Sequence, residues 1–178
     1  MVNDRLTLSP AVRAEPPRPE DAFARGEGVA RPAIGTPAAE RVAHSITRGV
    51  CRMLGELGLG TLTEFSLPNG RRADVIGVDR NGRFVIVEVK SCAADFLSDG
   101  KWEDYLDYCD RYFFAVAPDF PQELLPAEHG LIVADAFDAV VVREAAETPM
   151  HASRRKAQLL RFALTASGRL SGLIDPRL

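Results

Sequence analysis

Residues 71–90 read RRADVIGVDRNGRFVIVEVK, and this stretch decides the fold. It holds two runs rich in β-branched residues, 72–78 and 83–90, on either side of an Asn-Gly turn sequence at 79–82. Such a short turn between β-branched runs predicts an antiparallel hairpin. The second run is apolar on both faces almost to its end, which predicts a central strand covered on both sides.

Upstream of this hairpin, the sequence predicts one more strand and a helix. Residues 61–67 form a third strand-like run, joined to the hairpin by a Pro-Asn-Gly turn at 68–70. The helix begins at Pro37 and ends at Gly58 and Gly60. Its apolar face follows helical spacing and consists of Val42, Ile46, Val50, Met53, Leu54 and Leu57.

Downstream, the pattern predicts a helix over 94–108, a strand over 112–117, short strands over 131–134 and 139–143, and a last helix over 153–165. The last helix is basic, and either a DNA backbone or water could face its charges, which are Arg154, Arg155, Lys156 and Arg161. This order of elements predicts an α/β domain in which helices flank a mixed central sheet.

Composition indicates the class of protein and its surroundings. Residues 1–36 are rich in proline and poor in large apolar side chains, so we predict a disordered tail before a single domain at 37–178. The net charge of −3 argues against nonspecific coating of nucleic acid. The 3 cysteines show neither disulfide nor zinc spacing. Without an apolar run of about 20 residues or a secretory signal, we expect a cytoplasmic protein that does not contact membranes.

Three charged residues, Asp74, Glu88 and Lys90, interrupt otherwise apolar strands, where charges are rarely buried unless paired or bound to metal. Side chains at i and i+2 share a strand face, so Glu88 and Lys90 point the same way. The short connection lets Asp74 lie beside them. Two carboxylates at one point suit Mg²⁺, with Mn²⁺ as a substitute, and the lysine would face a bound water or a phosphate. The pattern therefore predicts hydrolysis of a phosphodiester.

A structural explanation of the same residues stays open. Glu88 and Lys90 can be strand-end charges in water, and Asp74 can pair with Arg72. Glu-x-Lys alone is too short to exclude this explanation. The position of Asp74 on the preceding strand, together with the order of elements, favours a site.

The spacing from Asp74 to Glu88-Val89-Lys90, on a strand before a helix, resembles the PD-(D/E)XK nuclease superfamily, although Ala73 replaces the proline that names the motif. A longer string is similar to the MmcB family of bacterial DNA repair proteins. It spans residues 71–91 and continues with Asp95-Phe96, Lys101-Trp102, Tyr105 and Tyr108-Cys109-Asp110. The resemblance covers residues 38–165 and implies a restriction-endonuclease-like αβββαβ core and a Mg²⁺-dependent deoxyribonuclease.

The resemblance also implies roles for particular residues. It implies a metal held by Asp74, Glu88 and the backbone carbonyl of Val89. Lys90 would orient the attacking water. Many superfamily members add a glutamate from the first helix, where Glu40 is the candidate, and Glu64 on the first strand competes for that role.

The predicted helix at 94–108 carries a second basic residue of interest. On a helical wheel Lys101 lies in the middle of an apolar face formed by Ala94, Leu97, Trp102, Tyr105 and Tyr108. A lysine in that position is unusual, so we predict that Lys101 reaches the site and contacts substrate phosphate. Simple snorkelling to water is the alternative. Trp102 and Tyr105 are expected to pack rather than to stack on bases.

These observations predict a metal-dependent DNA nuclease in DNA repair, with DNA and a divalent metal as partners, a repair protein as a further partner and a homodimer as its assembly. The first rival is a module of the same fold that binds DNA or a repair partner with little or no turnover. The second rival is an interaction protein that exposes Trp102, Tyr105 and Tyr108, and burial of that face would exclude it.

Overall fold

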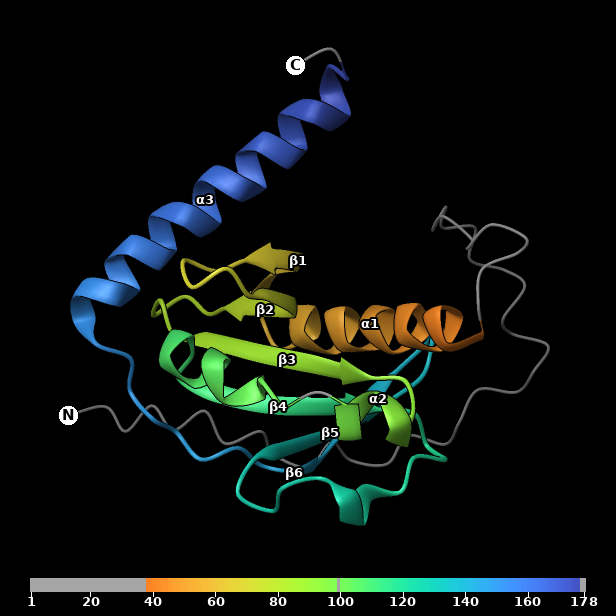
Figure 1. Ribbon diagram of the computed structural model, residues 1–178. Coiled ribbons are helices and arrows are strands. Elements are labelled where there is room, and N and C mark those ends of the chain that lie inside the picture. The colour runs from red at the N-terminus through yellow and green to blue at the C-terminus, as the bar shows by residue number, and fades with distance from the viewer. Residues whose placement is uncertain (1–37, 99, 177–178) are drawn as a thin grey trace. The chain divides into compact units, whose positions relative to one another are not determined.

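The computed structural model describes residues 38–98 and 100–176, so the tail predicted at 1–36 lies outside the described residues. The described part contains a six-stranded sheet whose strands lie side by side in chain order (Figure 1). The strands are β1 (Gly60–Ser66), β2 (Arg72–Val78), β3 (Phe84–Lys90), β4 (Arg111–Val116), β5 (Gly130–Ala134) and β6 (Ala139–Arg143). Each predicted strand is confirmed, with ends shifted by no more than a residue.

The sheet is mixed, as predicted. β1, β2 and β3 pair antiparallel, β3, β4 and β5 pair parallel, and β6 returns antiparallel to β5. The crossover from β3 to β4 carries α2 (Ala93–Ser98) and the 3₁₀ helix η2 (Trp102–Tyr108), and η3 (Gln122–Leu124) lies between β4 and β5. The central position expected for the third strand is confirmed, since nearly all of β3 is buried.

Both predicted hairpin turns follow one backbone pattern. The Gly70 N–H donates to Leu67 O and the Gly82 N–H donates to Asp79 O, at 3.1 and 3.0 Å. Both glycines have positive φ, 82° and 74°. A type I turn followed by a left-handed residue closes a short hairpin in this way and favours glycine there. The two Asn-Gly sequences thus set the register of β1, β2 and β3.

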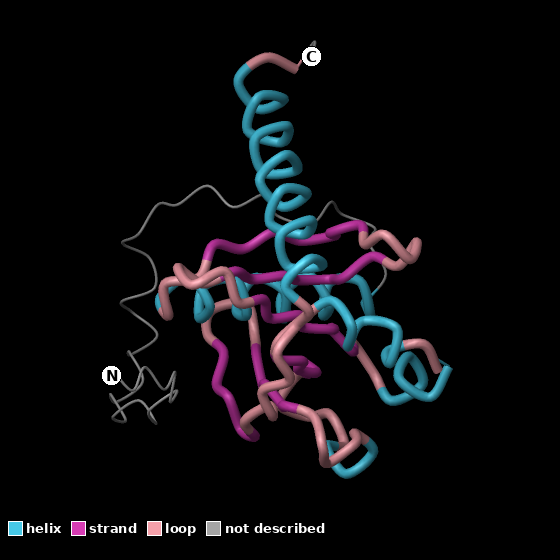
Figure 2. The backbone as a smooth tube through the Cα atoms, turned by 90° about the vertical axis from the view of Figure 1, so that its left-hand side faces the viewer, coloured by secondary structure: helices cyan, strands magenta, loops and turns pink. Residues whose placement is uncertain are grey.

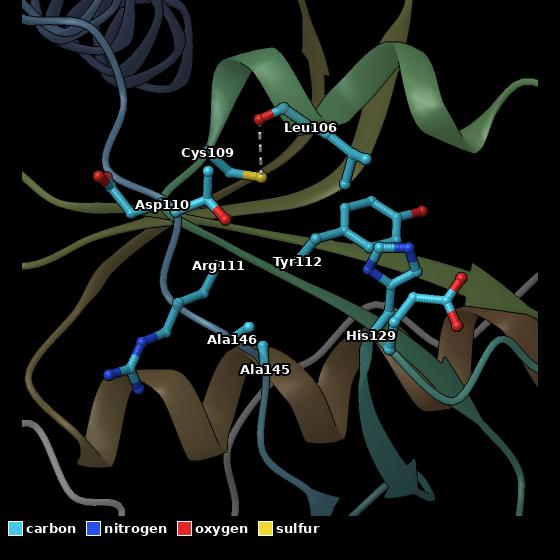
Figure 3. Close-up of a pocket in the computed structure, with 10 residues that line it drawn as sticks. Leu106, Cys109, Asp110, Arg111, Tyr112, His129, Ala145 and Ala146 are labelled. Atoms are coloured by element: carbon cyan, nitrogen blue, oxygen red, sulfur yellow. Dashed lines mark hydrogen bonds between the residues drawn. The ribbon is translucent and has the colours of Figure 1, made fainter.

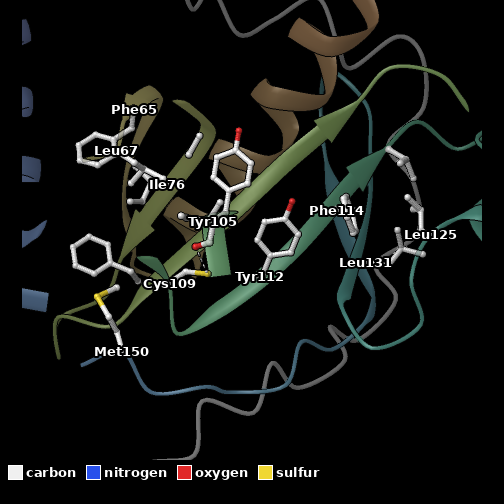
Figure 4. Close-up of a cluster of buried hydrophobic side chains, with 14 of the residues drawn as sticks. Phe65, Leu67, Ile76, Tyr105, Cys109, Tyr112, Phe114, Leu125, Leu131 and Met150 are labelled. Carbon is white, nitrogen blue, oxygen red and sulfur yellow. Dashed lines mark hydrogen bonds between the residues drawn. The ribbon is translucent and has the colours of Figure 1, made fainter. Parts of the chain in front are cut away.

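Helices cover the two faces of the sheet, as the tube view shows (Figure 2). α1 (Ala38–Glu56) packs on one face, where its Ile46 and Val50 meet Val75, Val87 and Ile132. The opposite face carries an aromatic cluster that includes Tyr105, Tyr112 and Phe114, with Phe65 and Ile76 (Figure 4). Because side chains alternate along β3, Val87 and Val89 face α1, whereas Glu88 and Lys90 lie on the aromatic side.

The single helix predicted at 94–108 is wrong, because the chain forms α2 and η2 as separate short helices. Gly100, between them, disfavours a continuous helix. In a 3₁₀ helix residues three apart lie above one another, which aligns Trp102, Tyr105 and Tyr108 toward the sheet. Lys101 therefore lies exposed ahead of η2, rather than in the middle of an apolar face.

The last helix, α3 (Ala152–Ile174), is longer than the predicted 153–165. Its first half is fixed to the domain: Arg155 pairs with Asp110, and Gln158 Nε2 donates to Tyr108 O at 2.6 Å. Phe162 packs on Phe65 with ring centroids 6.0 Å apart. The C-terminal turns extend past β1 (Figure 1).

Candidate functional site

The site begins where β2 and β3 stop pairing through their backbones. Their register runs from Val78 opposite Phe84 to Val75 opposite Val87. At the next position the Asp74 side chain enters, and its Oδ2 accepts the Val89 N–H at 2.7 Å. A carboxylate therefore takes the place of a strand-pairing carbonyl. This bond fixes the Asp74 side chain at the end of β3, as the sequence predicted for its position.

Glu88 and Lys90 lie together on the aromatic face, close to where Asp74 meets β3. Both are nearly inaccessible to water, with 6% and 3% exposure, and Lys90 Nζ lies 3.3 Å from Glu88 Oε1. Exposed strand-end charges are thereby excluded for this pair. A buried ion pair of this kind is a weak source of stability, because desolvation offsets most of the attraction. Its burial instead is typical of a functional site.

The pKa of Asp74 is raised to about 6, because burial disfavours the charged carboxylate. The Val89 N–H and the Lys90 ammonium oppose this rise, while the charges of Glu64 and Asp95 add to it. Desolvation is the largest of these influences, and Glu64 and Asp95 place further negative charge near Asp74. A carboxylate that is desolvated and has acidic neighbours is an environment that a bound cation would relieve.

Asp95 is a neighbour of the site that the sequence reasoning did not single out as a site residue. Its Oδ2 accepts the Ser91 backbone N–H at 3.2 Å and the Ser91 hydroxyl at 3.3 Å. These bonds fix the first residue after β3 and place an acidic group near Asp74. The signal was present in the sequence, since Asp95 follows Lys90 by five residues at the start of the predicted helix.

Of the two additional glutamates, the structure places Glu64 in electrostatic contact with Asp74. Glu64 has a positive φ of 49° and forms an ion pair with Arg72, from Oε2 to Nε, at 2.6 Å. Arg72 thus pairs with Glu64, which differs from the alternative pairing of Arg72 with Asp74. Glu40 is exposed in the first turn of α1, on the other face of the sheet from Glu88.

The aromatic residues of η2 are packing residues, as expected. Tyr105 is buried and stacks on Tyr112 at 6.2 Å, and Trp102 meets the His129 ring edge to face at 4.6 Å. Tyr108 lies under the guanidinium of Arg154, 5.3 Å from its ring centroid. Tyr105 is buried and Trp102 and Tyr108 are half-buried against the domain, which argues against the rival in which the three form an exposed interaction face.

Tyr112 brings a buried hydroxyl toward the site. Burial, and next the charge of Glu88, raise the pKa of Tyr112 above its usual range, so the phenol stays protonated. Within residues 38–98 and 100–176 its hydroxyl has no hydrogen-bond partner. A buried donor near a carboxylate is a feature that the sequence did not indicate.

The site offers two carboxylates as possible ligands for a metal ion. Asp74 and Glu88 supply carboxylate oxygens, and Mg²⁺ commonly keeps several waters beside one or two carboxylates. No group of three or more His, Cys, Asp or Glu in the described ranges is placed to hold a metal. Two carboxylates completed by water are a ligand set that Mg²⁺ accepts, whereas structural zinc usually takes four protein ligands.

Asp110 is a second important aspartate that the sequence reasoning did not assign. It is 3% exposed and accepts hydrogen bonds from Phe84 N, Met150 N and two nitrogens of Arg155, at 2.6 to 3.0 Å. Burial alone would raise its pKa, but Arg155 and the backbone donors hold the pKa of Asp110 below its usual range. Asp110 thus joins β3, the segment before α3, and α3 itself, which is a structural role.

A pocket of about 190 Å³ lies at the start of β4 and is distinct from the Asp74 site (Figure 3). Asp110, Arg111, Tyr112 and His129 contribute to its lining. β3 and β4 run parallel, with Ile86 opposite Tyr112, so this pocket lies toward the beginning of the strands. Glu88 and Lys90 lie at their ends.

The fold and site define an α/β domain with a buried acidic centre at the end of its central strand. A family model for the MmcB-like DNA repair proteins matches residues 30–177, so the chain belongs to that family. The SPO1766 protein of unknown function from Silicibacter pomeroyi is similar in structure, with a TM-score of 0.74 and 46% sequence identity. The match covers 76% of this chain and 92% of that one. None of the curated proteins matches this chain.

The family assignment confirms the resemblance to MmcB proteins and ties the chain to DNA repair. Membership of the PD-(D/E)XK superfamily remains a prediction. Within the part of the chain that the structure describes, no helix is long and apolar enough to cross a bilayer.

Proposed function

We propose that this chain is a metal-dependent DNA nuclease of the MmcB-like repair family. The observation that carries the proposal is the convergence of Asp74, Glu88 and Lys90 at the end of β3, with the pKa of Asp74 raised to about 6. Perturbed titratable groups at one point are typical of catalytic sites. DNA, rather than RNA, is proposed as the substrate because the family is one of DNA repair proteins.

Each residue has a proposed role in phosphodiester hydrolysis. Asp74, Glu88 and the Val89 carbonyl would hold Mg²⁺ or Mn²⁺, with Glu64 as the additional carboxylate rather than the more distant Glu40. A divalent ion bound there would supply Lewis-acid stabilisation of phosphate charge and a water of lowered pKa. Lys90 would orient the attacking water, and the exposed Lys101 would bind substrate phosphate.

The test is cleavage of labelled single-stranded, duplex and branched DNA in Mg²⁺ or Mn²⁺, with EDTA as the metal-free control. Asp74→Ala and Lys90→Ala are expected to abolish cutting. Glu123→Ala is a matched control, because Glu123 is an exposed carboxylate of η3. Cutting that persists in Asp74→Ala would contradict the assignment of the site.

A second function is favoured by one observation. Lys90 is 3% exposed and is ion-paired with Glu88, so the site must open before an attacking water can reach Nζ. A module that grips DNA or a repair partner without turnover needs no such movement. Metal-dependent binding of DNA with no product on any of the three substrates would favour this module over the nuclease.

A further inference from the structure

From Leu160 onward, α3 exposes an apolar stripe to solvent. We define the α3 stripe as Leu160, Leu164, Leu170 and Ile174, whose exposures are 62%, 63%, 59% and 77%. Leu160 with Leu164, and Leu170 with Ile174, form two i, i+4 pairs, and large aliphatic side chains exposed to this degree mark an interaction surface. The stripe lies within residues 30–177, the match to the family model, so it belongs to the region that defines the family.

The stripe is on the side of α3 opposite its contacts with the domain. Arg155, Gln158, Phe162 and Arg169 face inward: Arg155 and Gln158 bind Asp110 and Tyr108 O, Phe162 packs on Phe65 and Phe84, and Arg169 donates to the carbonyls of Thr63 and Glu64. Positions 160, 164, 167, 171 and 174 follow one another at spacings of three and four and form the outer face, and Leu170 lies at its edge. The domain therefore leaves this face available.

We propose that the α3 stripe is the contact with a second copy of this chain, in an antiparallel helix pair that crosses near Ser167. In that arrangement Leu160 lies opposite Ile174, and Leu164 lies opposite Leu170, since each pair is equidistant from residue 167. Ser167, Gly168 and Ser171 near the crossing are small, so the two backbones can approach closely. The stripe is thus complementary to itself.

The charges of α3 select this orientation. Its basic residues outside the Asp110 pair lie mainly in its first half, at Arg154, Lys156 and Arg161. Between Ala152 and Ile174 there is no acidic residue, and the helix is capped by Asp175. An antiparallel copy places each basic half beside the negative end of the partner's helix and its Asp175, whereas a parallel copy would stack like charges.

The first test is the mass of the full chain in solution, measured by sedimentation equilibrium over a concentration series. We expect twice the mass of one 19.4 kDa chain for the wild type. Leu164→Glu and Leu170→Glu each place a carboxylate against an apolar side chain of the partner helix, and both should give folded monomers. Leu97→Glu is the matched control, because Leu97 is an exposed leucine of α2 at 72%, and it should stay dimeric.

The second test determines the orientation by oxidation of single cysteines in a Cys92→Ser background, which removes the exposed native thiol. Ser167→Cys should form a disulfide-linked dimer, because position 167 meets itself at the crossing. Leu160→Cys should not, because its two copies would be about 21 Å apart along the axis and a disulfide needs Cα atoms within about 7 Å. In a parallel pair both would cross-link.

Each result decides the proposal. A monomeric wild type would overturn it and leave the stripe to a different macromolecule, such as a repair protein or DNA. A dimer that survives Leu164→Glu and Leu170→Glu would place the contact elsewhere. Cross-linking of Leu160→Cys would overturn the antiparallel orientation. None of these measurements depends on nuclease activity.

Discussion

Asp74 Oδ2 accepts the backbone N–H of Val89 at 2.7 Å, so a side chain of β2 replaces the strand pairing that ends one residue earlier. Burial raises the pKa of this carboxylate to about 6. The end of the strand pairing thus holds a carboxylate whose ionised form is disfavoured by burial, and a bound cation would stabilise that form. This relation can be tested without any substrate.

Asp74→Asn is expected to stabilise the folded protein at pH 8 by about 1–3 kcal/mol, because an ionised buried carboxylate is replaced by a neutral amide whose oxygen can still accept the Val89 N–H. A raised carboxyl pKa means that the folded state binds more protons than the unfolded state between about pH 4 and pH 6. The stability of the wild type therefore falls as pH rises from about 4 to about 6. The difference in unfolding free energy between Asp74→Asn and the wild type should vanish at pH 4. Urea unfolding at both pH values measures the difference.

Asp79→Asn is the matched control for this experiment. Burial alone would raise the pKa of Asp79, but Arg83 and the N–H groups of the turn hold it below its usual value. The effect of the substitution on stability at pH 8 should therefore be opposite in sign to that of Asp74→Asn. Its carboxylate contributes stability above the unfolded pKa, and the asparagine variant should be less stable at pH 8. If both variants lost stability at pH 8, the desolvated state of Asp74 would be contradicted.

Lys90→Met is expected to move metal binding to higher pH. The ammonium of Lys90 lowers the pKa of Asp74, so its removal should raise that pKa further above 6. Protons compete with metal for a carboxylate, and the half-saturation pH for Mn²⁺ should rise by at least half a unit. Mn²⁺ binding followed by electron paramagnetic resonance from pH 5 to pH 8 measures this shift.

Lys101→Met, measured in the same Mn²⁺ titration, distinguishes the role of Lys101 from that of Lys90. Lys101 is exposed ahead of η2, and we predict that it contacts DNA rather than the metal. Its variant should keep the wild-type Mn²⁺ profile and bind DNA more weakly. A profile that shifts equally in both variants would show that the charge of Lys90 has no special relation to Asp74.

Asp110→Asn is expected to cost about 3 kcal/mol or more, because the variant leaves Arg155 without its buried counterion. The pKa of Asp110 lies below its usual range, so this stability is present above the unfolded pKa and is lost as pH falls through the folded value. The penalty should therefore shrink in acid. Urea unfolding at pH 7 and pH 3 measures it.

Asp107→Asn is the control for Asp110→Asn. Asp107 also pairs with an arginine of α3, at 3.3 Å from Arg154, but its side chain is 75% exposed. An exposed ion pair is worth less than about 1 kcal/mol. Equal losses in the two variants would contradict the anchoring role of Asp110.

The strands and the alignment of Glu88 with Lys90 could be predicted because they depend on local rules. Two-residue alternation and Asn-Gly turns fix β1, β2 and β3 together with the side on which each residue lies. The position of Asp74 followed from the same hairpin. Its bond to Val89 could not be predicted, since it depends on where the backbone pairing ends.

The remaining differences come from contacts between distant segments. The helix predicted at 94–108 is wrong because the 3₁₀ geometry of η2 brings Trp102, Tyr105 and Tyr108 against the sheet together. The anchoring role of Asp110 could not be predicted from the residues around it, because its hydrogen-bond donors include Met150 and Arg155, which lie about 40 positions later in the chain. The extended length of α3 likewise has no local signal, since its second half meets β1 through Arg169, whose acceptors Thr63 and Glu64 are more than 100 positions earlier in the chain.

Tyr112→Phe is expected to leave stability unchanged or to raise it by about 1 kcal/mol, because an unpaired buried hydroxyl costs free energy. Tyr105→Phe is the matched control: the Tyr105 hydroxyl donates to Arg72 O at 3.2 Å, and its loss should cost about 0.5–1.5 kcal/mol. Urea unfolding at pH 7 with equal m-values compares the two stacked rings directly. A loss in Tyr112→Phe as large as in Tyr105→Phe would show that the Tyr112 hydroxyl is bonded in solution, with Glu88, whose charge acts on it most, as its acceptor.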